Sequence, residues 1–317
     1  GTGTNPWGHA FDRWGQNFLT EGPQGGIWYL TPGQVPFWAK ERVPGIKQPP
    51  KSCGVTFASG GHLPTEMQDV FVLNAFKNRA VHRYRLDDDS SGFSAQEIVP
   101  PLIVSKEESF RPVDVKMGPD GAIYVLDWYN PIIGHMQYNF RDPRRDHDHG
   151  RVWRITAKGR PLLDRPDIEG SSIPQLLDNL RSPELYTRQQ SRRKLYELRA
   201  GAVTAGLDKW LTELDPSDAD HEEARLNALW TYQTVDRVAP ALLQELLRSS
   251  DPRVRAASTR VLRFWRDRIP EPLDELVVQI ADSHPRVRLE ALVALSHIPS
   301  LRSMELALSV LDRPMDR

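Results

Sequence analysis

The side chains best suited to chemistry gather in one stretch of the sequence, residues 127–150. The stretch holds carboxylates, imidazoles, guanidinium groups and an amide, namely Asp127, Asn130, His135, Arg141, Asp142, Asp146, His147, Asp148 and His149. Connections of this length between strands are unusual and often functional. The cluster therefore indicates a ligand-binding site. The alternative for each residue is that it is solvated, or ties the loop down through side-chain hydrogen bonds.

Four consecutive residues of this stretch have the composition of a divalent-metal site. In an extended chain His147 and His149 project to the same side, and Asp146 and Asp148 add carboxylate oxygens. These four residues are the candidate metal ligands. The competing interpretation is that they are solvated or paired with the neighbouring arginines.

Three strand-like runs position the cluster. Residues 113–117 alternate apolar and polar side chains, residues 122–126 are continuously apolar, and residues 151–155 alternate again. Between the first two, Gly118-Pro119-Asp120-Gly121 has the composition of a hairpin turn, because Pro presets φ and Gly tolerates positive φ. The chemically rich stretch is then the connection from the second strand to the third.

Earlier parts of the sequence repeat this plan, with units beginning near residues 8, 54 and 112. The strands expected in the first two units are residues 9–11, 17–19, 26–30, 55–57, 69–74 and 80–86, with 96–105 as an outer fourth strand. This spacing is typical of β-propeller blades with extended loops. The proline-rich residues 31–50 are expected to form a surface loop. The acidic residues 87–92 read as a solvated hairpin tip, with calcium binding as the alternative.

The second half of the chain is predicted to be helical. From about residue 171, Leu, Arg, Glu and Ala recur at helical spacing, after a linker over residues 158–170. Similar local sequences surround four arginines, Arg188, Arg225, Arg255 and Arg288. Two of these follow Ser-Asp-Pro or Ser-His-Pro, where Asp or Ser can cap a helix and Pro fits its first turn. The pattern predicts an α-α superhelix of HEAT-like repeats over residues 171–317.

Composition narrows the classes of function. The 317 residues leave room for about two domains, and the formal net charge of −1 provides no global attraction to nucleic acid. Acidic residues interleave with the repeated arginines, which are expected to hydrogen-bond loops of neighbouring repeats, so no nucleic-acid partner is expected. Cys53 is the only cysteine, which excludes an internal disulfide and a CxxCH haem site. No signal peptide or bilayer-spanning apolar run is present.

Four segments carry a resemblance to a known family: NPWGHAFDRWGQNFLTEG (5–22), SGGHLP (59–64), FRPVDVKMGPDGAIYVLDWYNPIIGHMQ (110–137) and RDPRRDHDHGRVWRITAKGRP (141–161). Through them, residues 1–160 resemble the membrane-bound dehydrogenase family of Planctomycetes and Verrucomicrobia. The resemblance implies a multidomain β + α chain. Residues 1–160 would be the C-terminal part of a six-bladed type of propeller, similar to soluble quinoprotein glucose and sorbosone dehydrogenases, with about three blades present. The missing blades are expected upstream of Gly1, and HEAT-like repeats follow over 171–317.

The resemblance also implies a cofactor site. In quinoprotein sugar dehydrogenases, pyrroloquinoline quinone with calcium lies over the propeller mouth, and Lys77 and Arg111 fall at family positions that hold its carboxylates. Cations on rigid strand ends suit a planar tricarboxylate, and Arg can grip a carboxylate in two places. The candidate cofactor-binding residues are Lys77, Arg111, Asp127, Trp128, Asn130 and His135. The family's catalytic histidine belongs to an earlier blade. The alternative is that Arg111 and Asp127 pair with each other and pin the loop.

The expected function is that of a quinoprotein-like oxidoreductase acting on a sugar or another alcohol. By resemblance, electrons would pass to a c-type cytochrome domain whose haem lies outside this chain, in the periplasm or cell envelope. The alternative is a non-catalytic propeller and solenoid module that binds a glycan or a protein partner. Both alternatives use the same fold, so the arrangement of the candidate site has to discriminate between them.

Overall fold

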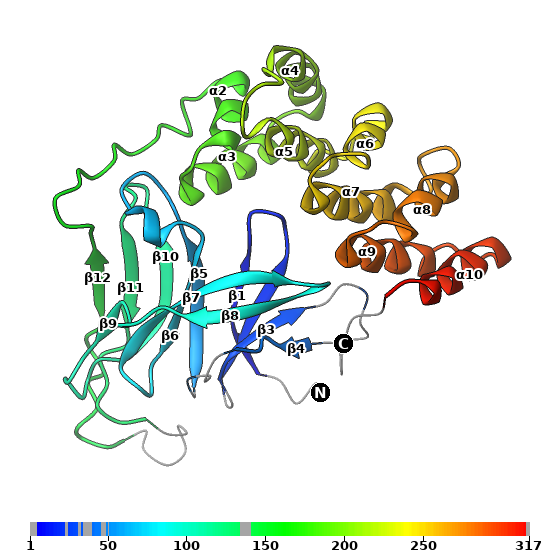
Figure 1. The fold of residues 1–317 in the computed structure, drawn as a ribbon. Coiled ribbons are helices and arrows are strands. Elements are labelled where there is room, and N and C mark those ends of the chain that lie inside the picture. The colour runs from blue at the N-terminus through cyan, green and yellow to red at the C-terminus, as the bar shows by residue number, and fades with distance from the viewer. Residues whose placement is uncertain are drawn as a thin grey trace. The chain divides into compact units, whose positions relative to one another are not determined.

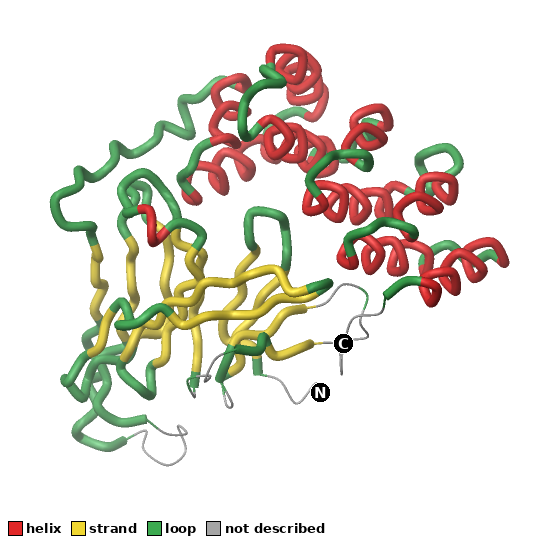
Figure 2. The backbone as a smooth tube through the Cα atoms, viewed as in Figure 1, coloured by secondary structure: helices red, strands yellow, loops and turns green. Residues whose placement is uncertain are grey.

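The computed structural model describes residues 5–22, 25–30, 33, 40–45, 49, 51–133 and 141–314. The chain forms two compact units (Figure 1). The first comprises Gly1–Arg165 and Pro183–Tyr186, and the second comprises Pro166–Ser182 and Thr187–Arg317. Strands belong to the first unit and α-helices to the remainder of the chain (Figure 2).

The first sheet is an antiparallel meander in which each strand pairs with the next. Its strands are β1 (Pro6–Phe11), β2 (Asn17–Glu21), β3 (Ile27–Leu30) and β4 (Lys40–Arg42). The β1–β2 turn forms because the Asp12 carboxylate accepts hydrogen bonds from the Trp14 amide at 2.9 Å and the Gln16 amide at 2.7 Å. Gly15 adopts the positive φ of 73° that this turn requires.

The second sheet repeats the meander and adds a short strand. Its elements are β5 (Ser52–Ala58), β6 (Val70–Ala75), β7 (Ala80–Asp89) and β8 (Gly92–Glu97), and β9 (Ile103–Val104) also pairs with β7. A single 3₁₀ turn, η1 (Thr65–Met67), interrupts the β5–β6 loop. The acidic residues 87–92 form the β7–β8 hairpin, in which Asp89 pairs with Gly92.

The third sheet has three strands, β10 (Pro112–Met117), β11 (Ile123–Asp127) and β12 (Arg151–Ile155). The β10–β11 turn follows the predicted Gly-Pro-Asp-Gly chemistry. Asp120 Oδ1 accepts from the Ala122 amide at 3.1 Å, and Gly121 has a φ of 78°. The connection from β11 to β12 is the long stretch that contains the candidate site residues.

Apolar faces hold the three sheets together. One core cluster combines Phe18 with Phe57, Phe71 and Phe93 and so joins the first and second sheets. A second cluster joins the second and third sheets through Val72, Val115, Ile123 and Val125, among others. Burying each such side chain stabilises the fold by about 1.5–3 kcal/mol. Apolar residues of all three sheets therefore contribute to the two clusters.

The first strands of the three sheets lie next to one another, with β5 between β1 and β10. Two glycines permit this approach. A Cβ on Gly8 would lie 2.3 Å from the Cys53 carbonyl oxygen, and one on Gly54 would lie 2.4 Å from Asp114 Cα. This arrangement of meanders around adjoining first strands is that of propeller blades. The prediction of a partial β-propeller followed by HEAT-like helical repeats is confirmed.

Two strand predictions need correction. The outer strand of the second sheet is β8, residues 92–97, because the β7–β8 hairpin closes directly at Gly92 and β7 extends to Asp89. Of the expected strand 96–105, residues 96–97 belong to β8 and residues 103–104 form β9, which also pairs with β7. Within residues 31–50, expected as loop, β4 pairs with β3 and places Arg42 opposite Trp28. The Arg42 guanidinium lies 4.9 Å from the Trp28 ring centroid, which helps to retain this short outer strand.

The helical unit consists of short helices stacked in succession. They are α2 (Ile173–Asp178), α3 (Leu185–Glu197), α4 (Ala200–Glu213), α5 (His221–Thr234), α6 (Pro240–Leu246), α7 (Pro252–Trp265), α8 (Pro272–Ile280), α9 (Pro285–Ser296) and α10 (Leu301–Leu308). Helices α5, α7 and α9 form a row in which each packs against the next. Helix α6 packs against α5 and α7, and helix α8 packs against α7 and α9. No described helix is long and apolar enough to cross a membrane.

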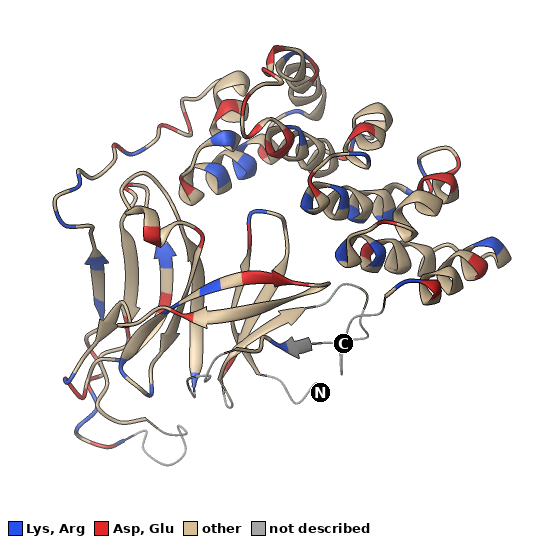
Figure 3. Cartoon of the chain, viewed as in Figure 1, with Lys and Arg blue, Asp and Glu red and all other residues tan. Residues whose placement is uncertain are grey.

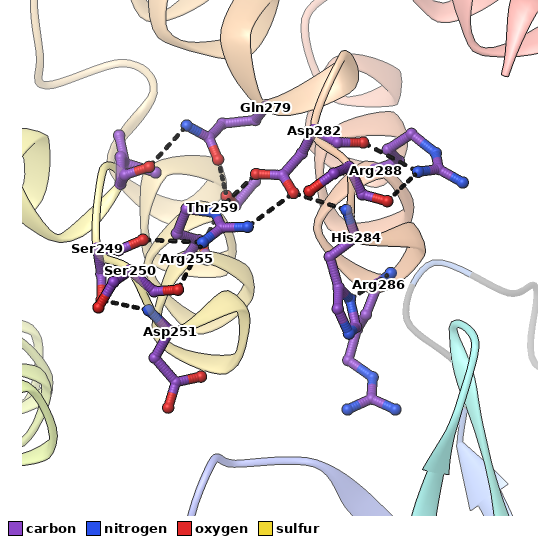
Figure 4. Close-up of polar contacts among 12 residues, drawn as sticks. Ser249, Ser250, Asp251, Arg255, Thr259, Gln279, Asp282, His284, Arg286 and Arg288 are labelled. Carbon is purple, nitrogen blue, oxygen red and sulfur yellow. Dashed lines mark hydrogen bonds and ion pairs between the residues drawn. The ribbon is translucent and has the colours of Figure 1, made fainter.

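The repeated arginines have a structural role, as expected. Arg188, Arg255 and Arg288 each donate from Nη1 to the carbonyl six residues earlier, at 2.6, 2.8 and 2.9 Å. Arg255 also binds the Asp282 carboxylate of the next loop, at 2.7 and 2.9 Å (Figure 4). Basic side chains are frequent on α3, α7 and α9 (Figure 3).

The observed N-cap residue is the predicted one for helix α7 and a different one for helix α9. Asp251 caps α7 by accepting from the Arg253 amide at 2.8 Å. In the next repeat His284, and not Ser283, is the cap of α9, where Nδ1 accepts from the Arg286 amide at 3.2 Å. The His284 amide in turn donates to Asp282 Oδ1 at 2.8 Å. Asp282 therefore links the cap of one helix to the arginine of the previous repeat.

Candidate ligand-binding rim

The meander topology brings one set of chain segments to one end of the first unit. These are the starts of β1, β5 and β10 and the connections β2–β3, β6–β7 and β11–β12. Direct contacts link them, since the Trp7 and Phe76 rings stack at 5.5 Å and Arg111 reaches the Phe76 carbonyl. We call this end the rim and define it by Trp7, Phe76, Lys77, Glu107, Arg111, Asp127, Trp128, Tyr129, Asn130, Arg151 and Trp153.

Arg111 precedes β10 and is buried, with 6% of its surface exposed. Its Nε donates to the Asn130 carbonyl at 3.0 Å and its Nη2 donates to the Pro131 carbonyl at 3.0 Å. Nη1 donates to the carbonyls of Phe76 and Phe110, both at 3.4 Å. Burial, together with the charge of Arg79, lowers the pKa of this guanidinium. Arg111 thus fastens the β11–β12 connection to the β6–β7 turn.

Asp127 ends β11, and its carboxylate is fully enclosed, with 0% of the side chain exposed. Oδ1 accepts from the backbone amides of Arg111 at 2.7 Å and Tyr129 at 2.9 Å. Oδ2 accepts from Arg151 Nε at 2.8 Å and Trp153 Nε1 at 3.0 Å. The pairing of Arg111 with Asp127, which was the alternative to a ligand site, therefore exists, but the donor is the Arg111 amide and not its guanidinium.

Arg151, at the start of β12, joins the Asp127 carboxylate to Glu107. Its Nη1 donates to both Glu107 carboxylate oxygens at 2.9 Å. The guanidinium also lies 4.2 Å from the Tyr129 ring centroid and 5.1 Å from that of Trp153. The hydrogen bonds to Glu107 and Asp127 raise the Arg151 pKa despite its partial burial, so it keeps its charge at any physiological pH.

The remaining candidate cofactor-binding residues differ from one another in exposure. Lys77 is exposed in the β6–β7 turn, directly after Phe76. Trp128 is 42% exposed, and the Arg145 guanidinium lies 5.7 Å from its ring centroid. Asn130 is 2% exposed, and its Oδ1 accepts from the Ile132 amide at 3.2 Å. His135 lies outside the described residues. Lys77 and Trp128 thus offer open surface, whereas Arg111, Asp127 and Asn130 are occupied by the protein itself.

The candidate metal ligands form a compact turn. Asp146 Oδ1 accepts from the amides of Asp148 at 2.9 Å and His149 at 3.0 Å, and the His149 imidazole contacts Asp146 Oδ2 at 2.9 Å. The hydrogen bond from the Asp148 amide is the largest cause of a lowered Asp146 pKa. His147 and Asp148 are exposed. Within the described ranges, no group of three or more His, Cys, Asp or Glu side chains could hold a metal ion.

Sequence reasoning missed Glu107, Tyr129 and Trp153 as members of the rim. Trp153 could have been found, because Arg151 and Trp153 are two residues apart in a strand and must lie on one face. Glu107 has no such signal, since its contact with Arg151 spans 44 residues of sequence. Tyr129 adopts a φ of 53°, and its amide donates to the Asp127 carboxylate. No sequence motif predicts this backbone conformation.

The described rim does not fit an anionic quinone as a set of ligands. A tricarboxylate needs several open cations, but the Arg111 donors are engaged by carbonyls and Arg151 is neutralised by Asp127 and Glu107. Lys77 is the described candidate whose cation is open. The open groups of the rim are the exposed Trp128 indole and the Lys77 ammonium group.

The SGGHLP motif lies at the opposite end of the first unit, in the β5–β6 loop. Gly60 has a φ of 134°, and the Gly61 amide donates to Glu184 Oε1 at 2.5 Å. His62 is 1% exposed and contacts the segment that follows β12. This motif is therefore separate from the rim.

Comparisons with known proteins agree with the two-part fold. Residues 30–159 match the model of a domain of unknown function (DUF7133), and residues 239–317 match that of HEAT repeats. The HEAT match covers α6 to α10, which stack in succession in the structure. No curated protein matches the sequence.

Two solved structures are similar to part of the chain. A Thermus thermophilus protein named as an oxidoreductase (glucose dehydrogenase) is 19% identical with a TM-score of 0.32, and the match covers 47% of this chain and 44% of that protein. Another structure, named glucose dehydrogenase, is 23% identical with a TM-score of 0.29, covering 48% and 45%. The chain therefore spans less than half of each of these proteins.

Proposed function

We propose that this chain is part of a quinoprotein-like oxidoreductase that oxidises a sugar or another alcohol. The observation that supports this is the rim, where exposed Trp128 and open Lys77 stand on a backbone that Arg111 and Asp127 hold rigidly. Sugars present C–H faces that pack on indole rings and hydroxyl groups that bind charged side chains. A rigid rim limits the entropy lost on binding such a ligand.

The residues of this chain would have distinct roles at the rim. Arg111, Asp127 and Arg151 position the β11–β12 connection, because Arg111 and Asp127 are hydrogen-bonded within the protein and Arg151 is paired with Asp127 and Glu107. Trp128 would provide a stacking surface, and Lys77 a hydrogen-bond donor and positive charge. Arg111 also fixes the Phe76 carbonyl, at 3.4 Å, in the turn that presents Lys77.

For the complete protein we propose pyrroloquinoline quinone with calcium as cofactor, on the resemblance of residues 1–160 alone. The bound quinone would accept the two electrons of alcohol oxidation. Since the described rim does not fit its carboxylates, most of its ligands would have to come from other blades, with Lys77 as this chain's candidate. A c-type cytochrome domain as electron acceptor, and a periplasmic or cell-envelope location, belong to the same proposal.

The test is a dye-linked dehydrogenase assay on the complete protein, with a panel of sugars and polyols, with and without quinone and Ca²⁺. We expect turnover only with both additions. Lys77→Ala should weaken quinone binding about tenfold, the usual effect of losing one charge-assisted hydrogen bond. Lys116→Ala is the matched control, because Lys116 is an exposed lysine of β10 that pairs with Asp114. Absence of quinone binding and of turnover would remove the enzyme proposal.

The occupied state of Arg111 and Asp127 favours one other candidate, a non-catalytic glycan-binding module that uses the same rim. It predicts glycan binding without quinone, measured by calorimetry on this chain. Trp128→Ala should abolish binding, whereas Phe264→Ala, which removes an exposed aromatic ring of α7, should not. Glycan binding together with failure of the dehydrogenase assay would select this candidate over the enzyme.

A further inference from the structure

The imidazole of His62 bridges two backbone groups of the segment that leaves β12. Nδ1 lies 2.8 Å from the Pro161 carbonyl oxygen, and Nε2 lies 2.9 Å from the Ala157 amide nitrogen. We call residues 157–163 the exit segment. The ring is 1% exposed, so water does not replace either contact.

The two partners determine the state of the ring. A carbonyl oxygen can only accept a hydrogen bond, so Nδ1 must carry a proton and donate. A backbone amide can only donate, so Nε2 must be unprotonated and accept. Both contacts exist together only in the neutral Nδ1–H tautomer. An imidazolium would direct a second N–H at the Ala157 N–H and lose that bond.

Other contacts hold the exit segment at the same place. The Leu163 amide donates to the Asp120 carbonyl at 3.0 Å, and Arg160 Nη2 donates to the Gly61 carbonyl at 2.8 Å. Gly121, with a φ of 78°, approaches the ring closely, because a Cβ there would lie 2.7 Å from His62 Cβ. The β10–β11 turn therefore packs directly against the base of the His62 side chain.

We propose that His62 is an acid-sensitive latch that releases the exit segment from the β5–β6 loop. The carboxylates nearby are those of Asp120 and Glu184, and each has hydrogen-bond partners elsewhere in the first unit. Glu184 accepts from the Gly61 amide, and Asp120 from Ala122, Tyr124 and Arg154. The exit segment contributes the cations Lys158 and Arg160. None of these groups replaces the acceptor that Ala157 requires.

The experiment is amide hydrogen exchange on the whole chain at pH 7.5 and 5.5, normalised to the intrinsic exchange rate at each pH. Protection of the Ala157 amide is expected to fall by roughly fivefold to tenfold at pH 5.5, the effect of losing one hydrogen bond. Amides of β6, in the core of the second sheet, should keep their protection and so exclude global unfolding.

Two variants separate the latch from a general acid effect. His62→Gln can donate to Pro161 and accept from Ala157 without titrating, so it should remove the pH dependence. His82→Gln is the control, because it removes another imidazole of the same unit, on β7, which lies 2.9 Å from the Glu97 carboxylate. It should retain the wild-type behaviour.

The outcomes decide the proposal. The proposal is overturned if protection of the Ala157 amide in the wild type is the same at pH 7.5 and 5.5. It is also overturned if this protection falls as much in His62→Gln as in the wild type. If the Ala157 amide of His62→Gln is already unprotected at pH 7.5, the test rests on the protection of this amide in the wild type and in His82→Gln. A fall in both that spares β6 supports the latch, and no fall, or a fall that includes β6, overturns it.

Discussion

At the scale of single residues, Asp127 organises the β11–β12 connection. Its carboxylate receives four N–H donors, two from backbone amides and two from the side chains of Arg151 and Trp153. A buried carboxylate is tolerated only when its oxygens are satisfied in this way. Because the donors lie on both sides of the long connection, Asp127 determines where that connection leaves and rejoins the sheet.

We expect Asp127→Asn to destabilise the first unit by about 2–4 kcal/mol. The amide has nearly the same shape, but its NH₂ group would face N–H donors, and Arg151 would lose its buried counter-charge. Urea unfolding of the whole chain, followed by tryptophan fluorescence, measures this. Asp142→Asn is the control, because Asp142 binds Arg144 in an exposed loop, and it should change little. Equal stability of Asp127→Asn and the wild type would contradict the assignment.

At the scale of elements, Asp282 connects successive helical repeats. Its carboxylate binds the Arg255 guanidinium of α7 and the His284 amide at the start of α9 (Figure 4). Burial raises the Asp282 pKa, but these hydrogen bonds and the nearby positive charges more than offset that effect, so the pKa is lowered. The charged form is therefore the one that stabilises the stack.

Asp282→Asn should destabilise the helical unit by about 3 kcal/mol near pH 7, because it leaves Arg255 partly buried without its partner. A carboxyl whose pKa is lower in the folded state contributes stability above its unfolded pKa of about 3.9. That contribution is lost as pH falls through the folded pKa. The difference between wild type and variant in urea unfolding, followed by circular dichroism, should therefore shrink below about pH 4.

The control for this pH dependence is Asp236→Asn. Asp236 pairs with Arg268, but its side chain is 88% exposed, so the pair contributes little. A wild-type-to-variant difference for Asp282 that stays constant from pH 7 to pH 3 would show that the effect is one of packing and not of charge.

At the scale of the whole molecule, the third sheet ends in β12, which pairs only with β11 among the strands that the structure describes. β12 pairs with β11 in continuous register, with no bulge and no proline. Val152 is 67% exposed, and Leu126, which lies opposite it, is 40% exposed. Both arginines of β12 are paired within the sheet and do not repel another strand. Edges of this kind promote pairing between chains.

Val152→Lys should therefore reduce self-association of the chain at micromolar concentration, as measured by light scattering. A lysine on an edge strand is a common device that prevents strand addition. Tyr196→Lys is the matched control, because Tyr196 is equally exposed, at 67%, but lies on α3. If both variants lower self-association equally, surface charge and not the β12 edge is responsible.

Whether a feature could be predicted from the sequence depends on how far apart in the chain the contacting residues lie. The β10–β11 hairpin, the bounds of β12 and the start of α7 follow from contacts within a few residues, which the local sequence specifies. The outer strand β8 was misplaced because its position depends on how far the β7 hairpin extends. The contacts of Arg111 with Phe76 and Pro131 join segments 35 and 20 residues apart.

The sequence by itself determined the change from strands to helices near residue 171, the repeated units and the residue types of the candidate rim. Hydrophobic period, turn chemistry and helix caps are local properties, and each was visible in the chain. Only the tertiary structure decided which of those residues are open. In the sequence, Arg111 and Asp127 suit a ligand site and a structural pin equally well. Burial assigns their polar atoms to the protein's own groups, because an enclosed charge must be satisfied where it lies.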